Sequence, residues 1–252
     1  MTNIYKFNDM AEDYSKYRPT YANECINYLQ QQLRLDCKST IADIGSGTGK
    51  LTKLLLDKGF KVNAVEPNDD MREISEIELG SLPAFKSIKG TAENTTLPDL
   101  SIDLITVGQA FHWFNIKRFL LECQRILKEM GSVAILYNNG DYTCELINRI
   151  SDLSKKYCPM YKGPSGGIEN NSQSFTDFFE FFDMLIFENN YKLTLEQFIG
   201  LNFSASYAPK KEDPNYQIYL NELIKIFEMY SEKGIITMQN NTILRLGKVK
   251  RK

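Results

Sequence analysis

Residues 40–68 contain the pattern that most constrains how this chain can fold. An apolar run is followed by three glycines at alternate positions: Gly45, Gly47 and Gly49. An apolar segment with helical spacing comes next, Gly59 is placed to end that helix, and a second apolar run ends at Glu66. This order predicts a strand, a tight glycine turn, a helix and a second, parallel strand. Because such crossovers are right-handed, Glu66 should emerge beside the glycine turn.

The residue types in this stretch indicate a ligand that contains a nucleoside. Glycine lets a ligand approach the backbone closely, and a carboxylate at the next strand end can accept both hydroxyl protons of a ribose. A dinucleotide fingerprint would need glycine where Lys50 stands. A phosphate-binding loop would need glycine in place of Ile44 and a hydroxyl in place of Leu51. Both of these motifs are therefore excluded.

The remaining pattern, with Asp43 before the glycines and Glu66 after the second strand, resembles the first two motifs of the class I S-adenosylmethionine (SAM)-dependent methyltransferases. Later segments are similar to further motifs of the methyltransferase type 11 branch: 7–19, 90–93, 97–98, 101–105 and 109–114. Residues 204–207 are similar to the trans-aconitate methyltransferase-like members of that branch.

This resemblance implies an α/β fold with a doubly wound, Rossmann-like sheet of seven strands, the last one antiparallel, and a helical or aromatic cap. It also implies SAM as cofactor, S-adenosylhomocysteine as product and a small-molecule methyl acceptor, which is a carboxylate in the trans-aconitate relatives. The expected division of this single methyltransferase domain has four parts: an N-terminal flap and helix over 1–34, a SAM-binding core over 35–140, a substrate cap over 141–213, and a C-terminal helix and strand over 214–252.

The resemblance and the strand–turn–helix pattern together assign residues of the flap, the glycine turn and the later turns to the cofactor: Tyr14, Arg18, Asp43, Gly45, Ser46, Gly47, Glu66, Pro67, Met71, Ala92, Glu93 and Gln109. Tyr14 or Arg18 is expected near the carboxylate end of SAM, and Met71 beside the adenine. Many relatives carry an acid where Thr91 stands. Glu93 or backbone should therefore hold the adenine amino group here.

His112 is the single histidine and lies among aromatic residues. It is either a hydrogen-bonded core residue or a polar group at the mouth of the substrate pocket that takes a proton. A carboxylate acceptor needs no base because it is already ionised. A phenol or amine acceptor would make His112 the candidate base.

Beyond residue 140 the alternation of strand and helix stops. A helix is expected over about 141–157, a connection or lid over 159–174, a long helix after Pro214 and a final strand over about 235–246. Six phenylalanines within thirteen residues are either core or an aromatic cap over a small substrate: Phe175, Phe178, Phe179, Phe181, Phe182 and Phe187.

The composition of the chain limits the classes of partner that it is expected to bind. The net charge of -2 provides no field that would attract nucleic acid, and no stretch of about 18 apolar residues predicts a membrane span. The five cysteines form no CxxC pair, which favours reduced thiols in a cytoplasm and no structural metal. Two alternatives stay open: a module that binds SAM without transferring a methyl group, and a methyltransferase acting on a macromolecule. The sequence names neither the acceptor nor the oligomeric state.

Overall fold

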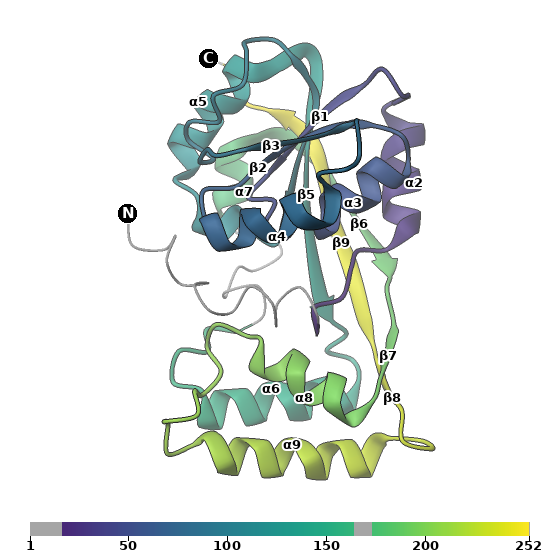
Figure 1. The fold of residues 1–252 in the computed structure, drawn as a ribbon, viewed down its shortest axis with the longest axis vertical. Helices are drawn as coiled ribbons and strands as arrows, with labels where there is room; N and C mark the ends of the chain where they lie inside the picture. Colours follow the sequence, from purple (N-terminus) through teal and green to yellow (C-terminus); the bar gives the residue numbers. More distant parts are fainter. Residues whose placement is uncertain (1–16, 164–172, 252) are drawn as a thin grey trace.

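Seven strands form one mixed sheet in the computed structural model, which describes residues 17–163 and 173–251 (Figure 1). In sheet order the strands are β3 (Phe85–Ile88), β2 (Lys61–Val65), β1 (Thr40–Ile44), β4 (Ile102–Gly108), β5 (Leu127–Gly140), β9 (Asn240–Val249) and β6 (Phe179–Glu188). The first five run parallel, whereas β9 is antiparallel to both of its neighbours. The predicted sheet of seven strands with its last strand antiparallel is therefore confirmed.

Helices cover both faces of this sheet, and together they form the sheet lobe. One face carries α2 (Asn23–Gln32), α3 (Lys50–Asp57) and α4 (Asp69–Leu79), and the other carries α5 (Ile116–Ile126) and α7 (Gln173–Phe178). Side-chain amides cap two of these helices, because Asn68 accepts from the Met71 N–H and Asn115 from the Arg118 N–H. Both caps begin a helix directly after a strand-end turn, where the functional residues were expected.

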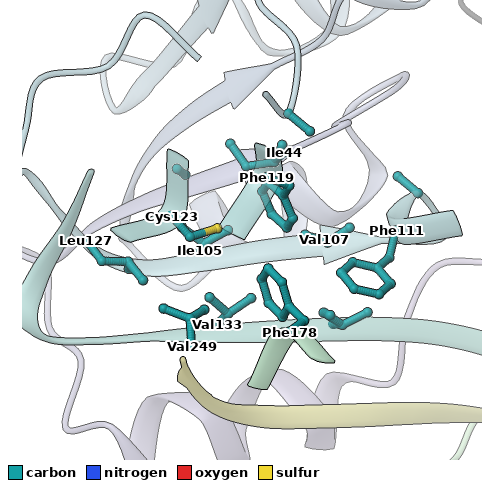
Figure 2. Close-up of a cluster of buried hydrophobic side chains, with 14 of the residues drawn as sticks. Ile44, Ile105, Val107, Phe111, Phe119, Cys123, Leu127, Val133, Phe178 and Val249 are labelled. Carbon is teal, nitrogen blue, oxygen red and sulfur yellow. The ribbon is translucent and has the colours of Figure 1, made fainter. Parts of the chain in front are cut away.

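The face under α5 and α7 is packed with aromatic rings. Figure 2 shows Phe119 of α5 and Phe178 of α7 facing each other, and their ring centroids are 5.2 Å apart. Phe175 stacks on Phe111 at the same separation. Phe175, Phe178 and Phe179 are at most 2% exposed. These three rings therefore belong to the core of the sheet lobe and form no cap over a substrate.

Three further helices form a separate helical lobe, which lies below the sheet in Figure 1: α6 (Glu145–Tyr157), α8 (Leu195–Phe203) and α9 (Tyr216–Tyr230). A two-stranded sheet of β7 (Tyr191–Leu193) and β8 (Ile236–Met238) belongs to the same lobe. Thr194 and Gln197 form a capping box at the start of α8. Helix α9 buries Tyr219, Leu223 and Phe227, which share one helical face.

The expected division of the chain needs correction. The cap was predicted as one insertion over 141–213, but α7 and β6 return to the sheet within that range because β6 pairs with β9. Helix α9, expected with the C-terminal strand, instead packs with α6 and α8 in one apolar cluster. The single final strand over 235–246 is two strands, because the chain changes sheets between β8 and β9. Strand β5 begins at Leu127, directly after α5.

Asparagine side chains hold the junction between the two lobes. The Asn138 amide donates to the Thr20 carbonyl (3.0 Å), and its Oδ1 accepts from the Thr242 hydroxyl (2.7 Å). The Asn189 amide also donates to Thr20 (2.8 Å), and the Asn240 N–H donates to Asn190 Oδ1 (2.9 Å). Residues 17–22, here called the strap, are thereby fixed where β5, β6 and β9 leave the sheet.

All five cysteines are free thiols. Burial raises the pKa of Cys25 to about 12 and the pKa of Cys123 well above its usual value, so both thiols stay protonated. Within residues 17–163 and 173–251, no helix combines the length and apolar character that crossing a membrane requires.

Candidate cofactor and acceptor site

A cavity of about 350 Å³ lies between the two lobes at the carboxyl ends of β1, β2 and β4. The sheet lobe contributes the glycine turn, Glu66 and the turns that follow β2, β3 and β4. The strap contributes Arg18, and the helical lobe contributes α6, α8 and the segments beside them. Eleven of the twelve residues assigned to the cofactor line this cavity: Arg18, Asp43, Gly45, Ser46, Gly47, Glu66, Pro67, Met71, Ala92, Glu93 and Gln109. Tyr14 lies outside the described residues.

The three glycines of the turn adopt left-handed backbone conformations for different reasons. Their φ angles are +67° at Gly45, +57° at Gly47 and +85° at Gly49. A Cβ atom at Gly45 would lie 2.8 Å from the Ala110 Cβ, and one at Gly49 would lie 2.8 Å from Leu79 Cδ1. A Cβ atom at Gly47 would meet nothing within 4 Å. Gly45 and Gly49 therefore allow close packing of the protein on itself, whereas Gly47 keeps the cavity open.

Glu66 joins the glycine turn to the end of β2, as the sequence predicts. Its Oε2 accepts from the Gly47 N–H and its Oε1 from the Asn68 N–H, both at 2.9 Å. Each carboxylate oxygen has a second lone pair, so the group can still accept hydroxyl protons from a ligand. Burial raises the pKa of Glu66, and these two backbone hydrogen bonds lower it in part. The hydrogen bonds from the Gly47 and Asn68 N–H groups hold the Glu66 side chain in a fixed position at the cavity wall.

Asp43 is a fully buried carboxylate at the end of β1. The Thr52 hydroxyl donates to its Oδ2 at 2.6 Å and the Thr106 hydroxyl to its Oδ1 at 2.9 Å. Burial raises the pKa of Asp43 to about 6, and the threonine hydrogen bonds partly oppose this shift. A negative charge at this point is costly for the protein alone, and a cationic ligand group would stabilise it.

Two hydroxyl groups in the glycine turn indicate a bound ligand. Ser46 Oγ and Thr48 Oγ1 are buried and have no hydrogen-bond partner among the described residues. Both residues line the cavity, and Thr48 is 2% exposed. A buried hydroxyl without a partner costs about 1 to 3 kcal/mol, which a polar ligand in the cavity would recover. Sequence reasoning named Ser46 but missed Thr48, although its hydroxyl lies in the same turn.

The adenine side of the expected site comes from α4 and the turn after β3. Met71 is 4% exposed on the first turn of α4, and Ala92 is 5% exposed. Glu93 Oε1 accepts from the Asn115 N–H at 2.8 Å, so one of its oxygens anchors the start of α5. Met71, Ala92, Glu93 and Thr91 all line the cavity. This wall offers apolar contact for a flat base and one carboxylate at its edge.

Gln109 carries backbone strain at the end of β4. Its φ is +55°, a left-handed conformation that is unfavourable for a residue with a side chain. The Gln109 N–H donates to the Leu136 carbonyl (2.9 Å), and its side-chain amide donates to the Asn138 carbonyl (3.0 Å). These bonds to β5 hold the strained turn at the cavity, which is typical of functional sites.

The structure does not bring His112 to the cavity. The adjacent Trp113 and Phe114 line the wall, whereas His112 is not among the described lining residues. Its Nδ1 lies 3.3 Å from the Tyr137 hydroxyl, and its ring lies 4.5 Å from the Trp113 ring. The interpretation of His112 as a hydrogen-bonded residue beside the core fits this geometry, and its assignment as a proton acceptor at the pocket mouth does not.

The helical-lobe wall differs in character from the sheet-lobe wall. It carries four tyrosines: Tyr142, Tyr161, Tyr191 and Tyr207. Among the described lining residues, the helical lobe contributes no carboxylate. Burial raises the pKa of Tyr191 to about 12 and raises that of Tyr207, while the positive charge of Arg18 lowers both in part. The phenols of Tyr191 and Tyr207 therefore stay protonated and can donate hydrogen bonds near a guanidinium group.

Comparisons with known proteins agree with this arrangement. Residues 42–135 match the family model described as "Methyltransferase domain". The "Uncharacterized methyltransferase Rv3342" of Mycobacterium tuberculosis is 31% identical over 147 residues, 58% of either chain. The "Uncharacterized methyltransferase C25B8.09" of Schizosaccharomyces pombe is 28% identical over 218 residues, 84% of either chain. The chain thus spans little more than half the length of the mycobacterial relatives it matches.

A solved structure shares the overall fold. It belongs to a protein of Anaeromyxobacter dehalogenans that is provisionally named a type II methyltransferase, with a TM-score of 0.71 and 20% identity, covering 92% of this chain and 98% of that one. The fold is therefore that of the class I methyltransferases, and residues 42–135 form a methyltransferase domain. SAM is the methyl donor of such a domain, and the unpartnered hydroxyls and open turn described above fit it.

Proposed function

We propose that this chain, through its methyltransferase domain, transfers the methyl group of SAM to a small-molecule acceptor whose reacting group is an ionised oxygen such as a carboxylate. The observation that carries the proposal is the contrast between the cavity walls. The sheet-lobe wall holds three carboxylates, Asp43, Glu66 and Glu93, and the helical-lobe wall holds tyrosine hydroxyls beside Arg18. A cationic donor suits the first wall and an anionic acceptor the second.

The residues of the chain act by binding and positioning in this reaction. SAM supplies an activated methyl group on a sulfonium, so the protein needs no covalent intermediate. Glu66 would hold the ribose, and Gly47 leaves room for the cofactor beside the backbone. Trp113 and Phe114 exclude water from the wall after β4. Alignment of the two reactants and a dry cavity supply the rate enhancement.

An acceptor that is already ionised would need no base, so the proposed reaction gives His112 no role in proton transfer. A carboxylate carries its attacking lone pair at neutral pH, so no proton has to be removed before the methyl group is transferred. The position of the cavity between two lobes, with Arg18 and Lys50 as the cations among its described lining residues, also favours a small acceptor over a macromolecule, which would need a basic groove.

Purified protein tests the proposal in two steps. Calorimetry should show binding of S-adenosylhomocysteine and no binding of NAD. A panel of small acids, amines and phenols is then screened for S-adenosylhomocysteine release, which we expect with an acid. Release with a protein or RNA substrate alone would favour the macromolecule alternative. Cofactor binding without release from any substrate would favour a binding module, and failure to bind S-adenosylhomocysteine would overturn the cofactor assignment.

A further inference from the structure

Arg18 of the strap is attached to the helical lobe through a residue that is distant in sequence. Its Nε donates to Ser204 Oγ at 3.0 Å, and its Nη2 donates to the Ser204 carbonyl at 3.4 Å. Ser204 is 2% exposed at the end of α8, and its hydroxyl in turn donates to the Leu201 carbonyl at 2.7 Å. Two hydrogen bonds from one guanidinium group to one residue fix the orientation of its plane.

A second contact holds the strap on the same helix. The Tyr17 ring lies directly on Gly200, where an added Cβ would be 2.6 Å from three ring atoms. The Tyr17 hydroxyl donates to Glu196 Oε1 at 3.3 Å. Tyr17 and Arg18 therefore contact two successive turns of α8. The position of Arg18 depends on the helical lobe, although Arg18 precedes the sheet lobe in sequence.

The surroundings of Arg18 distinguish it from the other cation of the cavity. Among the described lining residues, Arg18 and Lys50 are the cations. Lys50 is the first residue of α3, on the sheet-lobe side. The charge of Arg18 acts on Tyr191 and Tyr207 of the helical-lobe wall. A guanidinium beside phenol hydroxyls, on a wall to which the helical lobe contributes no carboxylate among the described lining residues, is suited to an anion.

We propose that Arg18 selects the methyl acceptor by binding an anionic group on it, and that Ser204 is the positioning residue that holds Arg18 for this task. The inference rests on the proposed methyl transfer and adds to it the residue that recognises the acceptor. The sequence places Arg18 near the carboxylate of SAM instead. The carboxylate that Arg18 binds belongs either to the acceptor or to the amino-acid part of SAM, and an experiment can distinguish the two.

The first measurement compares steady-state kinetics of the wild type and variants with an acceptor found in the panel. Arg18→Gln should raise the KM for the acceptor at least about tenfold and change kcat much less, because the charge binds the anion in the ground state at least as strongly as in the transition state, where methylation neutralises it. Ser204→Ala should raise KM about three- to fivefold, and Ser204→Thr, which keeps the hydroxyl, should restore it. Arg149→Gln is the matched control, since Arg149 pairs with Glu145 outside the cavity.

The second measurement identifies the source of the carboxylate. Trp113 is the single tryptophan and lines the cavity, so its fluorescence reports binding there. S-adenosylhomocysteine and 5′-methylthioadenosine, which lacks the amino-acid part, are titrated into the wild type and Arg18→Gln. We expect both ligands to bind the variant with wild-type affinity, which also shows that the variant is folded.

Three results would overturn the proposal. Arg18→Gln could lose affinity for S-adenosylhomocysteine and keep it for 5′-methylthioadenosine, which would assign Arg18 to the cofactor. The variant could retain the wild-type KM, or the accepted substrate could carry no anionic group. Failure of the wild type to bind S-adenosylhomocysteine would instead be a failure of the proposed function, so the two are distinguishable.

Discussion

The sheet lobe and the helical lobe both line the cavity, but they do so with different parts of the chain. The sheet lobe combines backbone with fixed carboxylates: three glycines adopt left-handed conformations, and the amides of Gly47 and Asn68 fix the Glu66 carboxylate. The helical lobe uses side chains, chiefly phenol hydroxyls of residues such as Tyr191 and Tyr207. Backbone geometry tolerates few substitutions, whereas side chains can be exchanged one at a time. Changes in the sheet lobe should therefore remove cofactor binding, and changes in the helical lobe should alter acceptor choice.

The largest effect is expected at Gly47. Gly47→Val places a branched side chain in the cavity, and binding of S-adenosylhomocysteine should fall by about a hundredfold or more. Gly59→Val is the matched control, because Gly59 has a φ of +84° and open space around it but does not line the cavity. Both variants should lose about 1 to 3 kcal/mol of unfolding free energy from the strained φ. Calorimetry that finds equal affinities in the two variants would contradict this role for Gly47.

The buried Asp43 should make the stability of the sheet lobe depend on pH. The pKa of Asp43 is about 6 in the folded state, above its unfolded value. The stability that protonated Asp43 contributes to the folded state is therefore fully present below about pH 4 and is lost as the pH rises through 6. The loss is on the order of 3 kcal/mol. Urea unfolding of the wild type and Asp43→Asn between pH 4 and 7.5 measures the difference. A stability difference between the two proteins that does not change with pH would show that Asp43 titrates normally.

Glu66 should give a somewhat smaller effect on cofactor affinity than Gly47. Loss of a charge-assisted hydrogen bond costs about 1.5 to 3 kcal/mol, so Glu66→Ala should bind S-adenosylhomocysteine about ten- to a hundredfold more weakly. Tyr207→Phe removes a hydroxyl from the opposite wall and should leave this affinity within about twofold. Unchanged affinity in Glu66→Ala would refute the ribose assignment. A large loss in Tyr207→Phe would show that the helical lobe also binds the cofactor.

The smallest effect is expected at His112. His112→Gln keeps hydrogen-bonding capacity toward Tyr137 and lies off the described cavity wall. Turnover at pH 8 should therefore stay within about threefold of the wild type, with SAM binding unchanged. A hundredfold loss would make His112 the base and would exclude an acceptor that is already ionised.

The sheet-lobe half of the site could be predicted from sequence because its determinants are local. The glycine turn, the cap at Asn68 and the strand ending at Glu66 lie within thirty residues, and the handedness of the crossover fixes how they meet. Thr48 was missed because burial of its hydroxyl without a partner is visible only in the folded structure. Local pattern therefore predicted that the glycine turn and Glu66 meet at one wall of the cavity.

The helical lobe could be predicted only in part, because its arrangement depends on distant partners. The apolar faces of α6 and α9 are readable as helices, but sequence does not say that they pack together. Phe178 and Phe179 suit a cap or a core equally well until the pairing of β6 with β9 places them. The hydrogen bond between Arg18 and Ser204 joins residues 186 positions apart, and no local sequence pattern predicts it.

The asparagine junction has a consequence for how this architecture can diversify. The described connections into the helical lobe leave from β5, β6 and β9, on one side of the sheet, while β1, β2 and β3 send none. A replacement lobe in place of residues 141–172 and 190–239 would therefore leave β1, β2 and β3 intact. New acceptor specificity would then require exchange of the helical lobe alone. Chimaeras joined at Asn138, Asn189 and Asn240 would combine this sheet lobe with helical lobes of other proteins.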